Sequence, residues 1–182
     1  MLRVSPSYLR ACFSYSTIAR VKAISASSYH SMVLMQDGSV WSTGNNQCGQ
    51  LGDESTDPEN SLTKVLSSGS TAISAGYEHG TVLKQDGSVW ATGENNFGQL
   101  GDGSQAFRSK FVQVISGGVQ GVAAGDGHSM VLKKDGSLWA RVPTCMVRSQ
   151  LGDGSIVSKN IFVRVLISRD GVCYNRYARS KV

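Results

Sequence analysis

The sequence repeats itself, and this repetition limits the folds that the chain can adopt. The stretch HSMVLMQDGSVWSTGNNQCGQLGD, which starts at His30, returns as HGTVLKQDGSVWATGENNFGQLGD from His79 and more divergently from His128. A period of 49 residues separates three kinds of marker: the histidines His30, His79 and His128, the pairs Asp37-Gly38, Asp86-Gly87 and Asp135-Gly136, and the tryptophans Trp41, Trp90 and Trp139. Each copy then ends in Gln-Leu-Gly-Asp, with its glycine at Gly52, Gly101 or Gly152. Such a period indicates an array of structural repeats.

Each repeat predicts a β-hairpin flanked by further strands. In the first copy, two short apolar runs flank Asp37-Gly38, a pair that favours a type I′ turn with positive φ at both central residues. The adjacent Val33 and Leu34 point to opposite faces of their strand, so the sheet needs apolar cover on both sides. Other short apolar runs lie outside the hairpins, at 21–24, 71–73, 111–115, 121–124 and 161–165. Four short strands per repeat are typical of a propeller blade.

The pattern His-Ser-x-x-Leu-x-x-Asp-Gly-x-x-Trp-x-x-Gly-x-Asn-x-x-Gly-Gln-Leu-Gly-Asp resembles the repeat of the regulator of chromosome condensation. This repeat is shared with bacterial seven-bladed propellers that include a β-lactamase inhibitor protein. The resemblance covers about 21–165. It implies an all-β fold: a partial β-propeller of about three blades, each a four-stranded antiparallel repeat, and not a closed ring. Family members act as exchange factors for a small GTPase, as substrate-recruiting parts of ubiquitin ligases and as enzyme inhibitors, so the fold does not select a function.

The repeats also suggest domain boundaries. We expect a non-repeat basic segment over 1–17, three repeats over about 18–66, 67–115 and 116–165, and a basic, disordered tail over 166–182. An open arc of three blades leaves apolar faces in water at both ends. We therefore interpret the chain as a fragment of a longer propeller, a degenerate gene product, or a protein that self-assembles through its exposed blade faces.

The third repeat departs from the pattern after its tryptophan. The step from Trp139 to Gln150 is eleven residues, against nine in the other two copies, and 141–148 contain neither glycine nor asparagine. A frame displacement in the coding sequence is one hypothesis, because permitted codons for this run restore Thr-Gly-x-Asn-x-x-Gly in a neighbouring frame. The nucleotide sequence of the transcript tests it.

The net charge of +5 belongs to the ends of the chain. Residues 1–24 carry +4, residues 162–182 carry +4, and the segment between them carries −3. The repeated surface therefore gives no support for specific nucleic-acid binding. No apolar run approaches the ~18 to 20 residues that cross a bilayer, so we expect no membrane partner.

The cysteines give limited information about the compartment. Cys12, Cys48, Cys145 and Cys173 lie far apart and without a Cys-x-x-Cys pair, which predicts neither a zinc site nor a disulfide framework. A reducing compartment, cytoplasm or nucleus, is the plain interpretation. The acid-free start MLRVSPSYLRACFSYSTIAR also fits an organellar transit peptide, although Pro6 and the scattered polar residues argue against an amphipathic helix.

No arrangement of residues predicts catalysis, a metal ion or a cofactor. One histidine per repeat is distributed around the array, so the three do not converge on one ion, and we expect each to bond a neighbouring turn. The aspartates of the Asp-Gly pairs suit local bonds in turns, and the tryptophans suit the gaps between blades. The sequence also lacks a Gly-x-Ser-x-Gly elbow, a phosphate-binding loop and a recognisable calcium loop.

The polar segments after the hairpins, 53–60 and 103–110, are the candidate interaction loops, because loops carry the binding sites of such scaffolds. The candidate residues are Asp53, Glu54, Asp57, Glu59, Gln105, Phe107 and Arg108. We predict a protein-interaction scaffold with a protein partner that the sequence does not name. Two alternatives stay open: a guanine-nucleotide exchange factor for a small GTPase as part of a longer propeller, and a degenerate or mis-predicted gene product without independent function.

Overall fold

A computed structural model describes residues 20–141 and 161–165. Within these residues the chain forms β-strands and no helix. The twelve strands are β1 (Val21–Ala26), β2 (His30–Met35), β3 (Val40–Gly44), β4 (Glu59–Leu66), β5 (Ser70–Ala75), β6 (His79–Lys84), β7 (Val89–Gly93), β8 (Arg108–Ile115), β9 (Val119–Ala124), β10 (Ser129–Lys133), β11 (Leu138–Arg141) and β12 (Val163–Val165).

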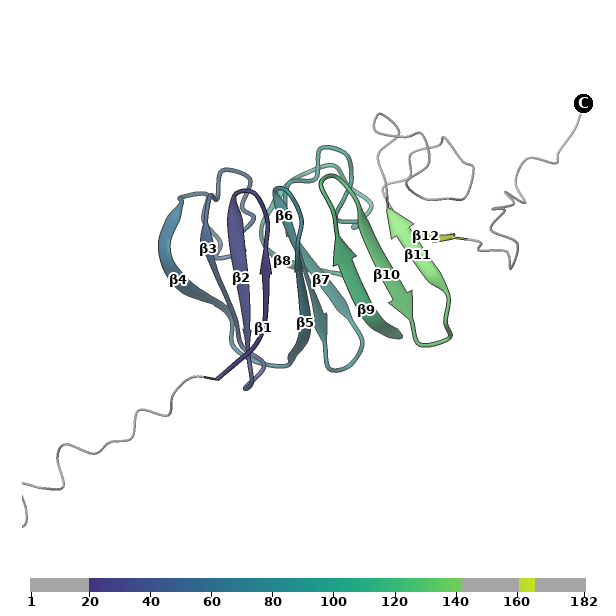
Figure 1. Cartoon of the computed structure of the whole chain (residues 1–182). Helices are drawn as coiled ribbons and strands as arrows, with labels where there is room; N and C mark the ends of the chain where they lie inside the picture. The colour runs from purple at the N-terminus through teal and green to yellow at the C-terminus, as the bar shows by residue number, and fades with distance from the viewer. Residues whose placement is uncertain (1–19, 142–160, 166–182) are drawn as a thin grey trace, which may run out of the picture.

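The strands form three four-stranded antiparallel sheets, and in each sheet strands adjacent in sequence are adjacent in space (Figure 1). Sheet 1 contains β1 to β4, sheet 2 contains β5 to β8, and sheet 3 contains β9 to β12. The three sheets stand in a row and do not form a closed ring within the described residues. The prediction of an all-β partial propeller with about three blades is therefore confirmed.

The hairpin turns differ from the predicted type I′ geometry. Gly38 has a φ of 79°, whereas Asp37 before it does not have a positive φ. The Gly38 amide donates to the carbonyl of Met35 at 3.0 Å, and the Met35 amide donates to the carbonyl of Ser39 at 2.9 Å. This is a three-residue connection, in which a type I turn is followed by one left-handed glycine. Asp37 stabilises it through its side chain, because Oδ1 accepts the Ser39 amide at 2.8 Å.

Alternation along the strands sends apolar side chains into the gaps between the sheets. In β2, Met32 and Leu34 are 1% and 0% exposed and face sheet 2, while Val33 lies on the opposite face. We call the gap between sheets 1 and 2 the first seam and the gap between sheets 2 and 3 the second seam. The buried cluster of the first seam contains Met32, Leu34, Val40, Val82 and Phe111. That of the second seam contains Leu83, Val89, Val119, Val131 and Phe162.

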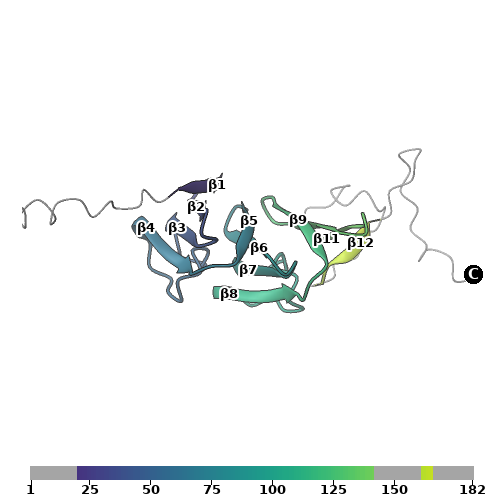
Figure 2. The same ribbon diagram turned by 90° about the horizontal axis from the view of Figure 1, so that it is seen from below.

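The first strands of the sheets approach one another along one edge of the row. β1 contacts β5, and β5 contacts β9; seen from below, these three strands lie on one margin and β4 and β8 on the other (Figure 2). Serine hydroxyls join them: Ser25 Oγ accepts the Ala75 amide, and Ser74 Oγ accepts the Ala124 amide, both at 2.9 Å. Convergence at one edge is the geometry expected of propeller blades around an axis.

A second tie joins each hairpin turn to the next sheet. The carbonyl of Gly38 accepts the Ser70 amide at 3.0 Å, and the carbonyl of Gly87 accepts the Val119 amide at 3.1 Å. Each seam thus combines an apolar interior with main-chain bonds at its margin.

Several expectations concern residues outside the described part of the chain. These are the predicted N-terminal segment 1–17, the basic tail 166–182, Gly152, three of the four cysteines, and nearly all of the proposed frame displacement over 141–148. The predicted domain boundaries also stay a prediction.

Candidate interaction surface

One end of all three sheets is made of turns and long loops, and we call it the loop face. Because the strands alternate in direction, the turns after β1, β5 and β9 lie at the same end as the connections after β3 and β7 (Figure 1). The loop face therefore consists of 27–29, 45–58, 76–78, 94–107 and 125–127. Both predicted interaction loops extend from it.

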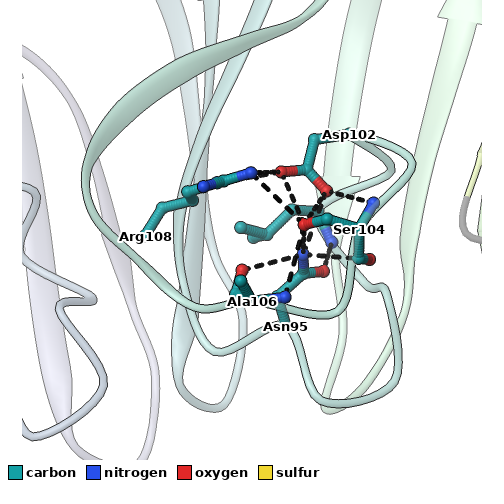
Figure 3. A network of polar contacts seen from close by, with 6 residues as sticks. Asn95, Asp102, Ser104, Ala106 and Arg108 are labelled. Atoms are coloured by element: carbon teal, nitrogen blue, oxygen red, sulfur yellow. Dashed lines mark hydrogen bonds and ion pairs between the residues drawn. The ribbon is translucent and has the colours of Figure 1, made fainter.

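The long loop of sheet 2 is organised around Asn95, whose side chain is fully buried (Figure 3). Its Nδ2 donates to Asp102 Oδ1 at 3.0 Å, to Ser104 Oγ at 3.1 Å and to the carbonyls of Ser104 and Ala106 at 3.2 and 3.0 Å. Its Oδ1 accepts the Leu100 amide at 3.0 Å. One buried amide group thus bonds four acceptors and one backbone amide of a loop that has no regular ladder of its own.

An ion pair closes this network. Arg108, the first residue of β8, donates to Asp102 Oδ2 through Nη2 at 2.7 Å and through Nε at 2.9 Å (Figure 3). Burial acts to raise the pKa of Asp102, but hydrogen bonds from the Ser104 amide, Arg108, the Ser104 hydroxyl and Asn95 together lower it. The carboxylate of Asp102 is therefore charged at neutral pH, and the Arg108 side chain is held by its ion pair with this loop residue.

The long loop of sheet 1 is organised around the equivalent asparagine, Asn46, but it differs in charge at its C-terminal end. Asn46 Nδ2 donates to Asp53 Oδ1 and to Ser55 Oγ, both at 3.0 Å, and its Oδ1 accepts the Leu51 amide at 3.0 Å. Glu59 stands where sheet 2 has Arg108, so this loop carries an additional acid in place of a base.

Buried glutamines brace the loops from below. Gln50 Oε1 accepts the Cys48 amide, and Gln99 Oε1 accepts the Phe97 amide, both at 3.0 Å. Gln99 Nε2 donates to Glu94 Oε2 at 3.0 Å, which fixes the position of that carboxylate on the surface. We did not single out these asparagines and glutamines from the sequence, although their recurrence at 49 residues was the available signal.

A depression of about 350 Å³ lies between sheets 2 and 3 on the loop face. Two aromatic and three acidic side chains, with one glycine, line it: Tyr77, Phe97, Glu78, Glu94, Asp126 and Gly127. The hydroxyl groups of Tyr77 and Tyr29 lie 2.9 Å apart, and the two rings meet edge to face at 4.9 Å between centroids. Sequence reasoning missed the acids, because they do not occupy equivalent positions in the repeats.

Cys48 lies beside this acidic region. Its Sγ is 3.8 Å from Glu78 Oε2. Burial, together with the charges of Glu78 and Glu94, raises the pKa of Cys48 to about 11. The thiol therefore remains protonated at neutral pH and is a poor nucleophile.

The predicted loop residues fall into two groups. The exposed ones are Glu54, Asp57, Gln105 and Phe107, whereas Asp53, Glu59 and Arg108 are half-buried. Glu59 and Arg108 are the first residues of β4 and β8. Arg108 is paired with Asp102, so it is less available to a partner than the sequence suggested.

The histidines of sheets 1 and 2 are buried at the seams. His79 Nε2 lies 3.0 Å from Ser129 Oγ of sheet 3, and that hydroxyl donates to the Gln99 carbonyl at 2.8 Å. His30 Nδ1 lies 2.9 Å from Ser27 Oγ in the preceding turn, and its Nε2 has no hydrogen-bond partner. Burial lowers the pKa of His30 to about 4; burial, and then the neighbouring His30 and His128, lower the pKa of His79 to about 3. Both are neutral at pH 7.

The tryptophans take different positions along the row. Each donates Nε1 to a turn serine: Trp41 to Ser39 and Trp90 to Ser88 at 3.1 Å, and Trp139 to Ser137 at 2.9 Å. Trp90 packs against the first-seam cluster and Trp139 against the second. Trp41 lies on the free face of sheet 1, with Lys64 Nζ 5.5 Å from its ring centroid.

The glycine before each loop aspartate allows the next sheet to approach closely. A Cβ at Gly52 or Gly101, which have φ of 76° and 77°, would lie 2.5 Å from a ring carbon of Phe111 or Phe162. These two glycines therefore serve seam packing as well as the turn. Among the described residues, no cluster of three or more His, Cys, Asp and Glu side chains could hold a metal ion, and no helix could span a bilayer.

Comparison with known families identifies the repeats. Models described as "Regulator of chromosome condensation (RCC1) repeat" match residues 21–50 and 71–99 in one case and 86–132 in another. The chain belongs to the RCC1 repeat family. The resemblance inferred from the sequence is thereby confirmed. No curated protein matches the RCC1-type chain in a sequence search.

Solved structures share the fold. Human WBSCR16 matches with a TM-score of 0.68 and 24% identity, over 82% of this chain and 40% of that one. Yeast RCC1 (Prp20), solved bound to Kap60, matches with a TM-score of 0.64 and 19% identity, over 82% and 38%. Prp20p from Saccharomyces cerevisiae matches with a TM-score of 0.59 and 20% identity, over 82% and 39%. This RCC1-type chain therefore spans about 40% of the length of these proteins.

Proposed function

We propose that the chain is a protein-interaction scaffold whose loop face binds a basic segment of a partner protein. The observation that carries the proposal is the distribution of charge. Among the described residues, the loop-face ranges given above contain no Lys or Arg and seven carboxylates, of which Asp102 is paired with Arg108 at the start of β8: Asp53, Glu54, Asp57, Glu78, Glu94, Asp102 and Asp126. The turns and links at the opposite end, 36–39, 67–69, 85–88, 116–118 and 134–137, carry three carboxylates and Lys134. A surface of one sign steers and selects partners of the other sign.

The depression between sheets 2 and 3 suits the same partner chemistry. Tyr77 and Phe97 offer aromatic surface for the apolar stem of a Lys or Arg side chain, while Glu78 and Asp126 offer negative charge for its head. Glu94 is held in place by Gln99, so part of this site is preorganised.

The relatives agree with a binding role without naming the partner. RCC1-type repeat proteins are generally binding or exchange factors rather than catalytic enzymes. Yeast RCC1 was solved with Kap60, and Prp20p is described by its binding to Gsp1p and histones. At 19% and 20% identity, over less than half of those chains, the likeness carries the fold alone, and none of the residues that the structure describes favours nucleotide exchange over simple binding.

The test compares two charge changes of equal size at opposite ends of the molecule. Glu54→Gln with Asp57→Asn removes two exposed charges from the loop face, and Gln36→Lys with Gln85→Lys adds two at the turn end. The probe is a fluorescein-labelled Lys/Arg-rich peptide, followed by anisotropy in low salt. We expect the loop-face variant to bind about threefold or more weakly and the turn-end variant to bind within about twofold of the unmodified chain.

Both variants raise the net charge by two, so a general charge effect changes them equally. Equal weakening, or no binding of the peptide by the unmodified chain, would refute the loop face as the binding surface.

A further inference from the structure

The two ends of the row of sheets expose different surfaces. We call the face of a sheet that points toward the preceding sheet its leading face, and the opposite one its trailing face. Each seam joins one trailing face to one leading face, so the leading face of sheet 1 and the trailing face of sheet 3 have no sheet against them in the described residues.

The leading face of sheet 1 has the apolar composition of a seam without its burial. Its Val21, Ile24 and Leu62 are 52%, 78% and 48% exposed. At the position of Leu62, sheets 2 and 3 have Phe111 and Phe162, which are 7% and 9% exposed inside the seams. An apolar patch of this kind on a protein surface marks an interaction site.

The trailing face of sheet 3 offers the complementary half. Leu132 is 40% exposed, whereas Leu34 and Leu83, its equivalents two repeats and one repeat earlier, are 0% and 5% exposed because the next sheet covers them. Met130 and Leu138 lie on the same face and are half-buried.

Polar groups at the two ends also match the seams. At the second seam His79 bonds Ser129; the corresponding residues left over at the ends are His128 on the trailing face and Ser31 on the leading face. His128 belongs to sheet 3 and Ser31 to sheet 1. Two copies of the chain could therefore form across their contact the hydrogen bond that His79 and Ser129 form inside the second seam.

The main-chain tie is left open in the same way. The carbonyls of Gly38 and Gly87 accept hydrogen bonds from backbone amides of the next sheet. A Cβ built on Gly38 would lie 2.8 Å from the backbone nitrogen of Gly69, and one built on Gly87 would lie 3.0 Å from that of Gly118. Around Gly136, the third member, nothing lies within 4 Å of such a Cβ. The amide equivalent to the donors Ser70 and Val119 is that of Val21, at the other end of the row.

We propose that the leading face of sheet 1 is a docking surface for the trailing face of sheet 3 of a second copy of this chain. The contact continues the two seams: Leu132 enters the patch of Ile24 and Leu62, His128 meets Ser31, and the Gly136 carbonyl accepts the Val21 amide. One tie is missing, because Ala123 stands where Ser25 and Ser74 bond the next sheet, so this contact is weaker than a seam.

A contact between two different faces is heterologous, which distinguishes it from a two-fold dimer. A docked pair still has one free leading face and one free trailing face. Further copies therefore add until the assembly closes into a ring or its two free faces are blocked. Two leading faces placed together would instead bury the apolar patches and leave both polar pairs unmade.

The experiment uses sedimentation velocity of the full chain from about 1 to 100 µM, the range of weak specific association. The unmodified chain is expected to form dimers and larger species as its concentration rises. Ile24→Asp blocks one face and Leu132→Asp blocks the other, and each is expected to raise the dissociation constant by about tenfold or more, because a charge is placed in the apolar contact.

The decisive sample is the equimolar mixture of Ile24→Asp and Leu132→Asp. Each variant keeps the face that the other lacks, so the mixture is expected to form 1:1 dimers that do not extend. Phe107→Asp, an equal change on a 55% exposed residue of the loop face, is the matched control and is expected to assemble normally.

Melting curves show that each variant is folded, and Leu62→Asp replaces Ile24→Asp if that variant is not. A chain that stays monomeric throughout the range, variants that assemble like the unmodified chain, or a mixture without 1:1 dimers would each overturn the proposal.

Discussion

The two seams solve the same packing problem with different residue pairs, and this difference can be reversed by mutation. At the second seam, Ser129 Oγ bonds His79 Nε2 and the Gln99 carbonyl next to Thr81. At the first seam, the serine is replaced by Gly80 and the threonine by Met32, which is 1% exposed. The methionine fills the volume that the hydroxymethyl group leaves. The consequence is that His30 Nε2 is buried without a partner.

The single change Gly80→Ser brings opposing effects. A new hydroxyl can bond His30 and the Gln50 carbonyl, whose oxygen lies 3.7 Å from a Cβ built at Gly80. Satisfying a buried polar atom is worth about 1 to 3 kcal/mol, and losing a strand glycine adds about 0.4 to 1 kcal/mol. Against this, the new Cβ lies 3.1 Å from the sulfur of Met32, and crowding in a packed core costs about 1 to 3 kcal/mol. We expect a net change within about 1 kcal/mol of zero.

The pair of changes removes the conflict. Met32→Thr alone empties a fully buried site and is expected to cost about 2 to 4 kcal/mol. With Gly80→Ser added, the first seam acquires the residues of the second, and the coupling free energy should be favourable by about 1 to 3 kcal/mol.

Urea unfolding followed by tryptophan fluorescence measures the free energy of unfolding for all four chains of this cycle. Ser129→Gly is the reciprocal control and should destabilise the second seam by about 1 to 3 kcal/mol, because His79 loses its partner. A coupling free energy within about 0.5 kcal/mol of zero would refute the idea that the residue types at positions 32 and 80 depend on each other.

Three further predictions follow from burial. Asn95→Ala should cost about 2 to 4 kcal/mol by urea unfolding, because it leaves several loop groups unbonded, whereas the exposed Asn96→Ala should cost under about 0.5 kcal/mol; similar losses would contradict the central role of the buried amide. Trp90→Ala at the first seam should cost about 2 to 4 kcal/mol, and Trp41→Ala on the free face about 1 kcal/mol, with the order of the two as the test. Lowering the pH from about 6.5 to 4 should destabilise the chain by up to about 1.4 kcal/mol per pH unit for each of the buried histidines His30 and His79. The pKa values of both lie below the usual 6.5 in the folded chain, so only the unfolded chain takes up protons in this range. A free energy of unfolding that stays constant in this range would show that the rings are accessible.

The sequence determined the architecture because repetition carries its own structural information. Recurrence of His30, Asp37 and Trp41 at 49 residues defines a unit too small to bury both faces of its sheet, and such a unit must stack on its neighbours. Alternation in Val33 and Leu34 then assigns one face to each neighbour. The turn type was beyond this reasoning, since Asp-Gly occurs in two-residue and three-residue connections alike.

The candidate surface depended on tertiary structure to a greater degree. Asp53 and Arg108 looked equally available in the sequence, but only the folded loop shows Arg108 closed onto Asp102. The depression combines Tyr77 with Asp126, which occupies the equivalent position one repeat later. Because the residue types at that position differ, the recurrence of residue types did not indicate the depression.

What the sequence fixes by itself is therefore the repeating unit, its strands and the need for stacking, because these follow from local periodicity. The partners of individual side chains across a seam were decided only by the fold. His30 and His79 occupy equivalent positions in their repeats, yet Nε2 of His79 contacts Ser129 whereas Nε2 of His30 has no partner, because the neighbouring sheet has Gly80 in place of the serine. Such differences arise from contacts between repeats, which the sequence of a single repeat does not contain.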